Sequence, residues 1–506
     1  MPNKYIKRIL EANVYDVAIE TPLDVAAHLS QRFSNNILLK REDLQPVFSF
    51  KLRGAYNKVI NLNAEERAIG VITASAGNHA QGLALAAQRL GIKAVIVMPK
   101  TTPGIKIRSV RHYGAKVVLF GDTFDEAYGH SLEIMKDKGY TYVHPYDDPD
   151  VIAGQGTIAM ELLRQYTKPI HALFVPVGGG GLIAGVSAYV KYLRPDIKVI
   201  GVESEDSACL TEALKKGRRV TLPEVGLFAD GVAVATIGKE PFRIAKKCVD
   251  EVITASTDEI CAAIKDIFDD TRSITEPAGA LAVAGLKKYV DKTGIKDETL
   301  IAIDSGANVN FDRLLHISER TELGEKREAL LLVAIPEKVG SFRNFCRLLG
   351  KRSITEFNYR YADEEKAHVF VGVRLADRES ELPGLMAHLD GKGYAVTDIS
   401  DNEMAKLHIR HLVGGRAQSV RHEEIFRFEF PERPGALMRF LHALGNRWNI
   451  SLFHYRNHGA AYGRVLVGLQ MEPTAKSKKE FKQFLQELGY RYWEETDNPA
   501  YKAFLS

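Results

Sequence analysis

A run of four glycines in the first half of the chain has the form of a phosphate-binding loop. It comprises Gly178, Gly179, Gly180 and Gly181, after a short apolar run and before a helical pattern that starts near Leu182. Bare backbone N–H groups at a helix N-terminus bind anions such as phosphate, although a flexible turn has a similar composition. The run also satisfies the dinucleotide fingerprint Gly-x-Gly-x-x-Ala, so a nicotinamide enzyme is an alternative. The absence of a Walker-type motif from the sequence argues against a nucleotide hydrolase.

A lysine lies among apolar and aromatic residues at a predicted helix start. Lys51 belongs to the segment 46–55, Pro-Val-Phe-Ser-Phe-Lys-Leu-Arg-Gly-Ala. Burial and a helix N-terminus both disfavour an ammonium group, so together they would lower the pKa of Lys51 and make its amine available for chemistry. From local composition alone, a surface lysine whose stem packs along an aromatic patch is the more common arrangement.

Two polar turns follow further predicted strands. Residues 75–79 and 305–308 each come directly after a short apolar run and present backbone donors suited to a carboxylate. Their serine and asparagine side chains are also common helix N-caps, which is the structural alternative. The residues singled out are Ser75, Ala76, Gly77, Asn78, His79 and Ser305.

The elements that must position these residues have an α/β pattern. From about residue 70 to 320, short β-branched runs alternate with longer helical patterns, which is typical of a mostly parallel sheet covered by helices on both faces. The expected strands are 71–73, 94–98, 116–120, 172–176, 198–202 and 300–303. Ligands bind beyond the carboxyl ends of such strands, where the glycine run and both polar turns lie.

The last third of the chain contains an internal repeat. The motif Pro-Glu-Lys-Val-Gly at 336–340 recurs as Pro-Glu-Arg-Pro-Gly at 431–435, about 95 residues later. Each copy has the pattern strand, turn, helix, strand, strand, helix. Two such modules behind an α/β core suggest a sensor attached to an enzyme.

Composition excludes several classes of function. Of the 506 residues 45% are hydrophobic and 26% charged, as in a folded globular protein. Lys and Arg (68) barely exceed Asp and Glu (64), and the net charge of +4 gives no basic field for nucleic acid or an anionic membrane. We therefore expect neither partner, and the ligands should be recognised in local pockets.

Cysteine usage and hydropathy indicate a cytoplasmic protein. The four cysteines form no paired Cys-x-x-Cys spacing, so we expect no disulfide framework and no metal site. No segment approaches the ~18 apolar residues that span a bilayer, and the first residues lack the apolar stretch of a secretory signal.

Taken together, the four motifs resemble those of the pyridoxal-phosphate-dependent serine/threonine dehydratases, which have the tryptophan-synthase-β-like fold. The motifs are Ser-Phe-Lys-Leu-Arg-Gly-Ala at 49–55, Ser-Ala-Gly-Asn-His at 75–79, the four glycines, and Ser-Gly-Ala-Asn at 305–308. With the tandem repeats, the resemblance covers essentially the whole chain and is nearest to the biosynthetic threonine dehydratases (threonine ammonia-lyases). It implies pyridoxal 5′-phosphate as cofactor.

The resemblance also implies a fold and a domain plan. The fold would be α/β: a two-domain fold type II core of parallel sheets with helices on both faces, followed by an α+β regulatory domain of two ACT-like repeats. The expected limits are 1–320 for the core, with a smaller subdomain at about 45–145 inserted in it, 321–328 for a linker, and 329–415 and 423–503 for the repeats.

The family's site residues transfer to matching positions in this sequence. By resemblance, Lys51 would hold the cofactor covalently and take the α-proton, and Asn78 would contact the 3′ oxygen of the cofactor. The backbone of Gly178 to Leu182 would hold its phosphate, and Ser305 would share a hydrogen bond with its pyridine nitrogen. The turn at 75–79 would bind the substrate carboxylate.

Two positions refine the expected reaction. Related racemases carry a second serine where this sequence has Ala76, and a methyl group cannot donate a proton, so dehydration is favoured over racemisation. Glu276 lies before Pro277 and is either a substrate-side carboxylate or an ordinary helix cap. Open alternatives are β-replacement on this same fold, a nicotinamide oxidoreductase and a catalytically silent amino-acid sensor.

The resemblance implies deamination of L-threonine to 2-oxobutanoate and ammonia, the first committed step of isoleucine biosynthesis, with some activity on L-serine. Isoleucine would inhibit through the C-terminal repeats and valine would oppose it; a homotetramer is also implied. The candidate effector residues are the repeated pairs Tyr359 and Arg360, and Tyr455 and Arg456, because Arg binds a carboxylate bidentately and Tyr can wall an apolar side chain. Alternatively, these pairs recur because they build each module's core.

Overall fold

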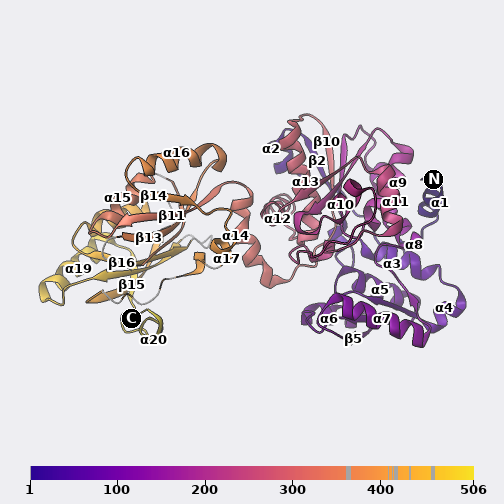
Figure 1. The fold of residues 1–506 in the computed structure, drawn as a ribbon, viewed down its shortest axis with the longest axis horizontal. Coiled ribbons are helices and arrows are strands. Elements are labelled where there is room, and N and C mark those ends of the chain that lie inside the picture. The colour runs from indigo at the N-terminus through magenta and orange to yellow at the C-terminus, as the bar shows by residue number, and fades with distance from the viewer. Residues whose placement is uncertain are drawn as a thin grey trace. The chain divides into compact units, whose positions relative to one another are not determined.

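The computed structural model describes most of the chain and divides it into two compact units. The described residues are 2–350, 352–360, 366–407, 409–412, 414, 417, 420–431, 435–456 and 462–505. The first unit spans Met1–Gly324 and the second Glu325–Ser506 (Figure 1). The expected fold class, a parallel-sheet catalytic core followed by a regulatory domain of two repeats, is confirmed.

The larger sheet of the first unit has six strands in the order β1-β2-β10-β7-β8-β9. All neighbouring strands are parallel except β1 and β2, which pair antiparallel. The strands are β1 (Leu23–Val25), β2 (Asn36–Arg41), β7 (Ala172–Pro176), β8 (Lys198–Ser204), β9 (Glu251–Ala255) and β10 (Thr299–Asp304).

Helices cover both faces of this sheet, as buried parallel strands require. In β2, Leu38 packs into the core on one face, whereas Ile37 and Leu39 pack into the core on the other. The helices are α1 (Pro2–Leu10), α2 (Ala27–Phe33), α8 (Pro149–Gln165), α9 (Gly181–Leu193), α10 (Cys209–Lys216), α11 (Lys239–Cys248), α12 (Thr257–Thr271), α13 (Pro277–Thr293) and α14 (Leu314–Gly324).

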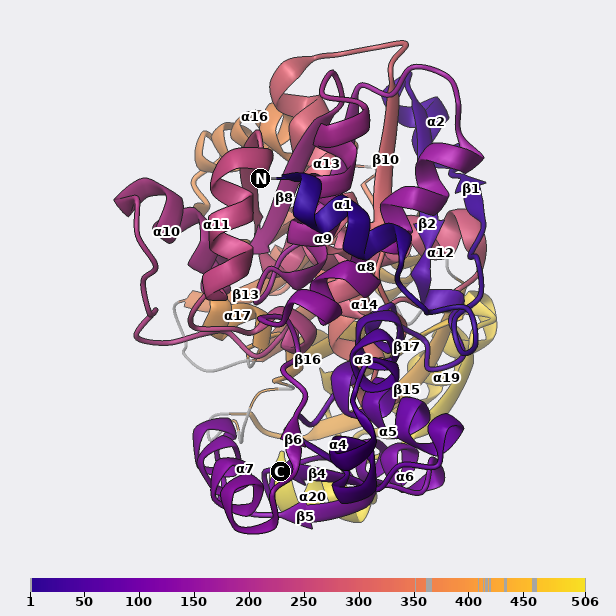
Figure 2. The ribbon, with the colours of Figure 1, turned by 90° about the vertical axis from the view of Figure 1, so that its right-hand side faces the viewer.

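A smaller parallel sheet, in the order β5-β4-β3-β6, forms a second subdomain of the first unit. In Figure 2 most of its labelled elements gather at the bottom of the picture. They are α3 (Lys51–Ile60), α4 (Ala64–Ile69), β3 (Val71–Ala74), α5 (Asn78–Leu90), β4 (Ala94–Met98), α6 (Gly104–His112), β5 (Lys116–Leu119), α7 (Phe124–Lys138) and β6 (Thr141–Tyr142).

Local sequence explains where several helices begin. Thr123 and Glu126 form a reciprocal capping box at the start of α7. Pro149 and Pro277 occupy the first turns of α8 and α13, where the missing N–H costs no hydrogen bond. Helix α14 continues to Gly324 and the next strand begins at Glu328, so the connection between the units is shorter than the expected linker.

The second unit is an eight-stranded antiparallel sheet in the order β14-β11-β13-β12-β16-β17-β15-β18. The two modules join where β12 pairs antiparallel with β16, and Asn358 lies opposite His454. The first module has β11 (Glu328–Pro336), α15 (Ser341–Leu348), β12 (Ile354–Arg360), β13 (Lys366–Arg374), α16 (Arg378–Asp390) and β14 (Ala395–Asp398). The second has β15 (Glu423–Pro431), α18 (Ala436–Leu444), β16 (Asn449–Arg456), β17 (Tyr462–Gln470), α19 (Ala475–Leu488) and β18 (Arg491–Glu494).

Each module ends in one more strand than its sequence pattern predicts, β14 and β18. Helix α17 (Glu403–Leu407) follows the first module and α20 (Pro499–Phe504) the second. One hydrophobic cluster rich in phenylalanine packs the four larger helices of this unit onto the sheet. In the second module, the central residues of the turn Pro-Glu-Arg-Pro-Gly at 431–435 lie outside the described residues. In the described part of the chain, every helix is too short or too polar to span a membrane.

Candidate active site

Lys51 is the first residue of helix α3 and is enclosed by the first unit. Its Nζ atom donates to the Pro145 carbonyl at 3.2 Å and lies 5.3 Å from the centre of the Phe50 ring. Burial lowers the pKa of Lys51 to about 8, and the negative charge of Glu276 offsets part of this shift. The amine is therefore far easier to deprotonate than an exposed lysine, as the sequence predicts.

Helix α3 is held in place by a fully buried guanidinium. Arg53 donates two hydrogen bonds of 2.8 Å to the Glu42 carboxylate, and it also donates to both carboxylate oxygens of Glu161 on α8. Lys40 balances the charge through a 2.6 Å bond to Glu161. Because removing one partner of a buried ion pair is costly, this network fixes the helix that carries Lys51.

Glu276 is a buried carboxyl that faces the same site. Its Oε1 atom accepts a 2.6 Å hydrogen bond from Asn78 Nδ2, and Asn308 Nδ2 in turn donates to Asn78 Oδ1 at 2.8 Å. Burial raises the pKa of Glu276 to about 7, and the negative charge of Asp230 adds to the shift. Although Glu276 occupies the cap position of α13, its side chain makes no capping hydrogen bond, so the geometry favours the site-facing alternative.

The glycine run presents a cradle of backbone donors after β7. In the described part of the chain, the N–H groups of residues 178–182 have no protein acceptor. Gly180 has φ +89, and a Cβ at Gly179 would lie 2.2 Å from the Tyr146 ring, so neither position accepts a side chain. Orphaned donors at the start of α9 are the arrangement that binds phosphate.

The turn at 75–79 forms a second cradle, after β3 of the smaller sheet. Helix α5 begins at Asn78, and the N–H groups of Ala76, Asn78 and His79 lack an acceptor among the described residues. His79 itself is buried: its Nε2 atom hydrogen-bonds to the Val143 carbonyl at 2.9 Å, and burial lowers its pKa to about 3. The imidazole is thus neutral and positions the turn.

Ser305 follows β10 and closes the site on the side of Lys51. Its hydroxyl donates to the Ala278 carbonyl at 3.2 Å, and its carbonyl accepts from the Phe50 N–H at 3.3 Å. Ser49 and Gly306 pair as an isolated β-bridge next to this contact. The turn after β10 is therefore joined to the turn that precedes Lys51.

A pocket with an empty volume of about 450 Å³ leads to Glu276. Its lining comes from both subdomains and comprises Pro103, Lys106, Asp230, Glu276, Pro277, Asn308, Val309, Asn310 and Arg313. Among the described residues, no group of three or more His, Cys, Asp or Glu side chains is arranged to hold a metal ion.

Sequence reasoning missed three residues of this site. Asn308 lay inside a motif but received no role, although a polar residue at the end of a buried strand is a recognisable signal. Asp230 belongs to the irregular stretch between α10 and α11 and gives no periodic signal. Tyr146 could be found only through its contact with Gly179.

Comparison with protein families decides which chemistry this arrangement serves. The sequence profile of the pyridoxal-phosphate-dependent enzymes matches residues 14–306. The profile of the C-terminal regulatory domain of threonine dehydratase matches twice, at 319–409 and 414–505. The chain belongs to the biosynthetic threonine dehydratase family. It is accordingly a pyridoxal-phosphate-dependent enzyme.

Full-length relatives support this assignment. A biosynthetic L-threonine dehydratase of Burkholderia multivorans is 57% identical over 99% of both chains, and that of Escherichia coli is 55% identical over 99% of this chain and 97% of its own. Among solved structures, the processed form of threonine deaminase isoform 2 from Solanum lycopersicum has a TM-score of 0.62 and 53% identity, covering 63% of this chain and 93% of its own.

The residues present fit pyridoxal phosphate. A cradle of unpaired N–H groups suits the phosphate, and an amine with a lowered pKa suits the aldehyde. The neutral hydroxyl of Ser305 suits a pyridine nitrogen that has no carboxylate partner.

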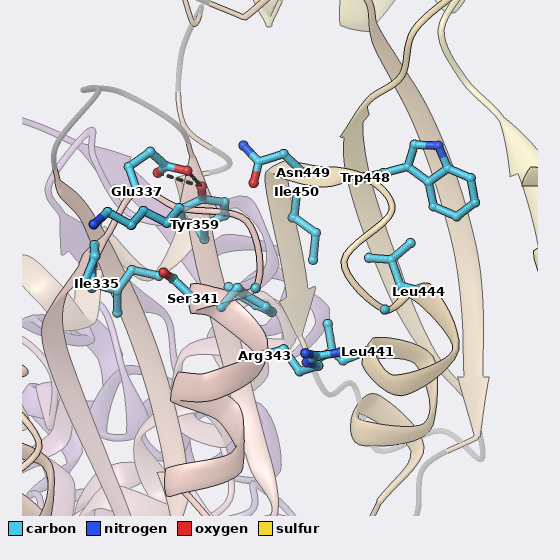
Figure 3. A pocket seen from close by; sticks show the side chains of 15 residues that line it. Ile335, Glu337, Ser341, Arg343, Tyr359, Leu441, Leu444, Trp448, Asn449 and Ile450 are labelled. Atoms are coloured by element: carbon cyan, nitrogen blue, oxygen red, sulfur yellow. Dashed lines mark hydrogen bonds between the residues drawn. The ribbon is translucent and has the colours of Figure 1, made fainter. Parts of the chain in front are cut away.

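The threonine dehydratase profile also covers a second pocket, which lies between the two modules of the second unit (Figure 3). Its lining comes from both modules. Tyr359 lines it and donates to Glu337 at 2.8 Å, and burial raises the pKa of Glu337. The Nε atom of Arg343, another lining residue, is buried and has no hydrogen-bond acceptor among the described residues.

Two of the other candidate effector residues, Arg360 and Tyr455, are not among the described residues that line this pocket. Arg360 makes an ion pair with Glu423 and donates to the Leu505 carbonyl at 2.8 Å. Tyr455 packs against the hydrophobic cluster, and the side chain of Arg456 lies outside the described residues. Among the members of the two pairs whose side chains are described, Tyr359 is the one that lines this pocket.

Proposed function

We propose that this enzyme converts L-threonine to 2-oxobutanoate and ammonia by α,β-elimination of water. The observation that carries the proposal is the placement of Lys51 and Glu276 between two cradles of unpaired backbone N–H groups. One cradle suits the cofactor phosphate and the other a substrate carboxylate. The names of the full-length relatives point to threonine as substrate.

When bound, the cofactor supplies an electron sink for the substrate's α-carbon. The N–H groups of the turn at 75–79 bind the substrate carboxylate, and the amine of Lys51 takes the α-proton. Asn78, held between Glu276 and Asn308, supports the turn next to the reacting atoms. Ser305 offers a hydroxyl and no negative charge at the pyridine nitrogen, which weakens the electron sink and favours prompt loss of the β-hydroxyl.

The overall reaction needs no further reactant. The α-proton and the β-hydroxyl leave threonine as one water molecule, and one water molecule hydrolyses the product to the 2-oxoacid and ammonia. With a pKa of about 7, Glu276 can hold or release a proton near neutral pH and assists transfer on the substrate side.

The direct test is an assay of 2-oxoacid formation with L-threonine and L-serine. We expect 2-oxobutanoate from threonine and slower formation of pyruvate from serine. A purified protein that binds pyridoxal phosphate but forms no 2-oxoacid from threonine would overturn the proposal.

We also propose that isoleucine inhibits the enzyme and valine opposes it through the second unit. The pocket in Figure 3 offers the groups that an apolar amino acid needs. The Glu337 carboxylate suits an ammonium, and Arg343, with its unpaired Nε, suits a carboxylate. Apolar lining for a branched side chain comes from Ile335, Phe342, Leu441, Leu444, Trp448 and Ile450.

Calorimetry with isoleucine, valine and leucine tests this regulatory site. We expect isoleucine and valine to bind and isoleucine to lower activity, with a coupling free energy of about 1–3 kcal/mol between the effector and substrate sites. Binding without any change of activity would remove the regulatory role.

The family resemblance further supports a homotetramer and a place at the first committed step of isoleucine biosynthesis. Sedimentation equilibrium of the full chain tests the assembly.

A further inference from the structure

The pocket that leads to Glu276 is crossed by an ion pair between the two subdomains of the first unit. Lys106 belongs to α6 of the smaller subdomain, and Asp230 lies in the short helical turn Asp230–Val232 of the larger one. The Lys106 Nζ and Asp230 Oδ2 atoms are 2.5 Å apart, although the residues are 124 positions apart in the chain.

The two halves of this pair are anchored differently. Arg313 Nη1 lies 3.8 Å from Asp230 Oδ1, and it donates to the Phe228 carbonyl at 2.8 Å, so Asp230 is fixed to the larger subdomain. Lys106 reaches across from the first turn of α6, which follows Pro103. Among the described residues, the ion pair is the direct contact that joins the lysine to the opposite wall, and the charge of Lys106 also acts to lower the pKa of Glu276 there.

The position of the pair relates it to catalysis. Lys106 and Pro103 form one wall of the pocket, whereas Asp230, Asn308 and Glu276 belong to the other. The carboxylate of Glu276 contacts Asn78, at the start of the turn-bearing helix α5. An amino acid that entered through this pocket would pass the ion pair before it reached these groups.

We propose that Lys106 and Asp230 are a positioning pair that latches the two subdomains together over the entrance to the active site. The latch opens for exchange of substrate and product, and when closed it holds the walls of the pocket at their working separation. The statement that an α-amino acid passes the latch rests on the proposed function, whereas the latch itself does not.

The chemistry of the pair suits repeated opening. The side chains are 18% and 33% exposed, and ion pairs of this kind are weak because water competes for both charges. Such a contact breaks on the time scale of loop and subdomain motion, so it can gate turnover without stopping it.

Hydrogen exchange of α6 tests the latch in the full-length enzyme loaded with pyridoxal phosphate. Lys106→Met keeps the stem and removes the ammonium, Asp230→Asn removes the opposite charge, and Lys106→Arg keeps a cation. The matched control is Arg111→Ala, an exposed cation of the same helix with no ion pair among the described residues. We expect the first two variants to exchange about twofold to fivefold faster over Gly104–His112 and their double variant to exchange no faster than either.

Kinetics separate a latch from a merely structural contact. Lys106→Met should raise KM for threonine about twofold to fivefold and change kcat less, because the closed state that retains substrate is weakened. Lys106→Arg and Arg111→Ala should behave like the unchanged enzyme. Unaltered exchange in Lys106→Met, or additive exchange in the double variant, would overturn the latch even if threonine is turned over. Faster exchange in an enzyme inactive on threonine would instead leave the latch standing and overturn the proposed substrate.

Discussion

The two units of this chain build their pockets in opposite ways. In the first unit all strands except β1 run parallel to their neighbours, so the turns after β3, β7 and β10 lie at carboxyl ends. The turns after β3 and β7 leave backbone N–H groups without an acceptor among the described residues. In the second unit the strands are antiparallel, and the pocket lies where the two modules meet. The proposed chemistry of the first unit therefore depends on local turns, whereas the proposed ligand binding by the second depends on a junction between repeats.

The charged groups of the two units also differ in their surroundings. Lys51 and Glu276 are buried with pKa values displaced toward neutrality, so their charges are poised to change. Arg360 and Glu423 in the second unit form an ion pair, which Tyr501 joins with a 2.6 Å hydrogen bond. Charge also holds structure together in the first unit, through Arg53 and Glu42, but there it surrounds a lysine whose pKa is lowered to about 8.

Replacing Lys51 should produce the largest effect and confine it to the first unit. Lys51→Ala removes the amine that we propose holds the cofactor and accepts the α-proton, so turnover of threonine should fall by about 10³-fold or more. Isoleucine binding, measured by calorimetry, should be preserved. The control is Lys100→Ala, because Lys100 is an exposed lysine. Substantial turnover of threonine by Lys51→Ala would show that the reaction does not depend on the amine of Lys51.

Glu276 should make the stability of the first unit depend on pH. Because its pKa is raised from 4.5 to about 7, the cost of its charge is absent below about pH 4.5 and complete above about pH 7. The free energy of unfolding of the cofactor-free enzyme should therefore fall across this window, by up to about 3 kcal/mol from this group. Glu276→Gln should remove that part of the slope.

Denaturant titration at several pH values measures the slope. Glu65→Gln, an exposed residue of α4, serves as control. If Glu276→Gln has the same slope as the unchanged enzyme, the carboxyl is ionised throughout and the poised charge is absent.

A smaller effect is expected at the glycine cradle. The added methyl group of Gly179→Ala would overlap the Tyr146 ring, and relieving such overpacking costs about 1–3 kcal/mol. Affinity for pyridoxal phosphate should fall about tenfold to a hundredfold, as measured by titrating the cofactor-free enzyme. Gly129→Ala, where a Cβ meets nothing within 4 Å, is the matched control. Equal affinities in the two variants would show that the loop does not hold the phosphate.

The smallest effect should appear at the junction of the repeats. Tyr359→Phe removes the hydroxyl that donates to Glu337, a contribution of about 1 kcal/mol. Isoleucine should bind about fivefold more weakly, with kcat unchanged. Phe342 and Trp448 keep the apolar lining intact, so the change isolates the hydrogen bond. Unchanged isoleucine affinity would place the effector elsewhere.

How far the sequence predicts this molecule depends on whether each signal is local. The expected strands at 94–98 and 172–176 match β4 and β7, since their residues are apolar and buried on both faces. Strand β2 escaped prediction because its apolar run is only three residues long and ends at Lys40 and Arg41. These two charged side chains are buried through partners far along the chain, Glu161 and Ser273 respectively. Strands β14 and β18 are mostly exposed edges with no alternating pattern to detect.

The same distinction applies to the sites. The motif predicts a lowered pKa for Lys51, but the burial that causes it comes from the surrounding fold, including Pro145, which lies 94 residues away in the chain. The pairing of Arg360 with Glu423 joins one repeat to the other and could not be foreseen from the Tyr-Arg motif, because binding and structural roles use the same residues. Asp230 acquires its role only when α6 brings Lys106 to it.

The most direct test of the division between chemistry and sensing is one assay of 2-oxobutanoate formation from threonine, with and without isoleucine. It compares the full chain with a chain that ends at Gly324, the limit of the first unit. The account predicts that isoleucine inhibits the full chain and that the shortened chain is active but insensitive. Inhibition of the shortened chain by isoleucine would contradict it.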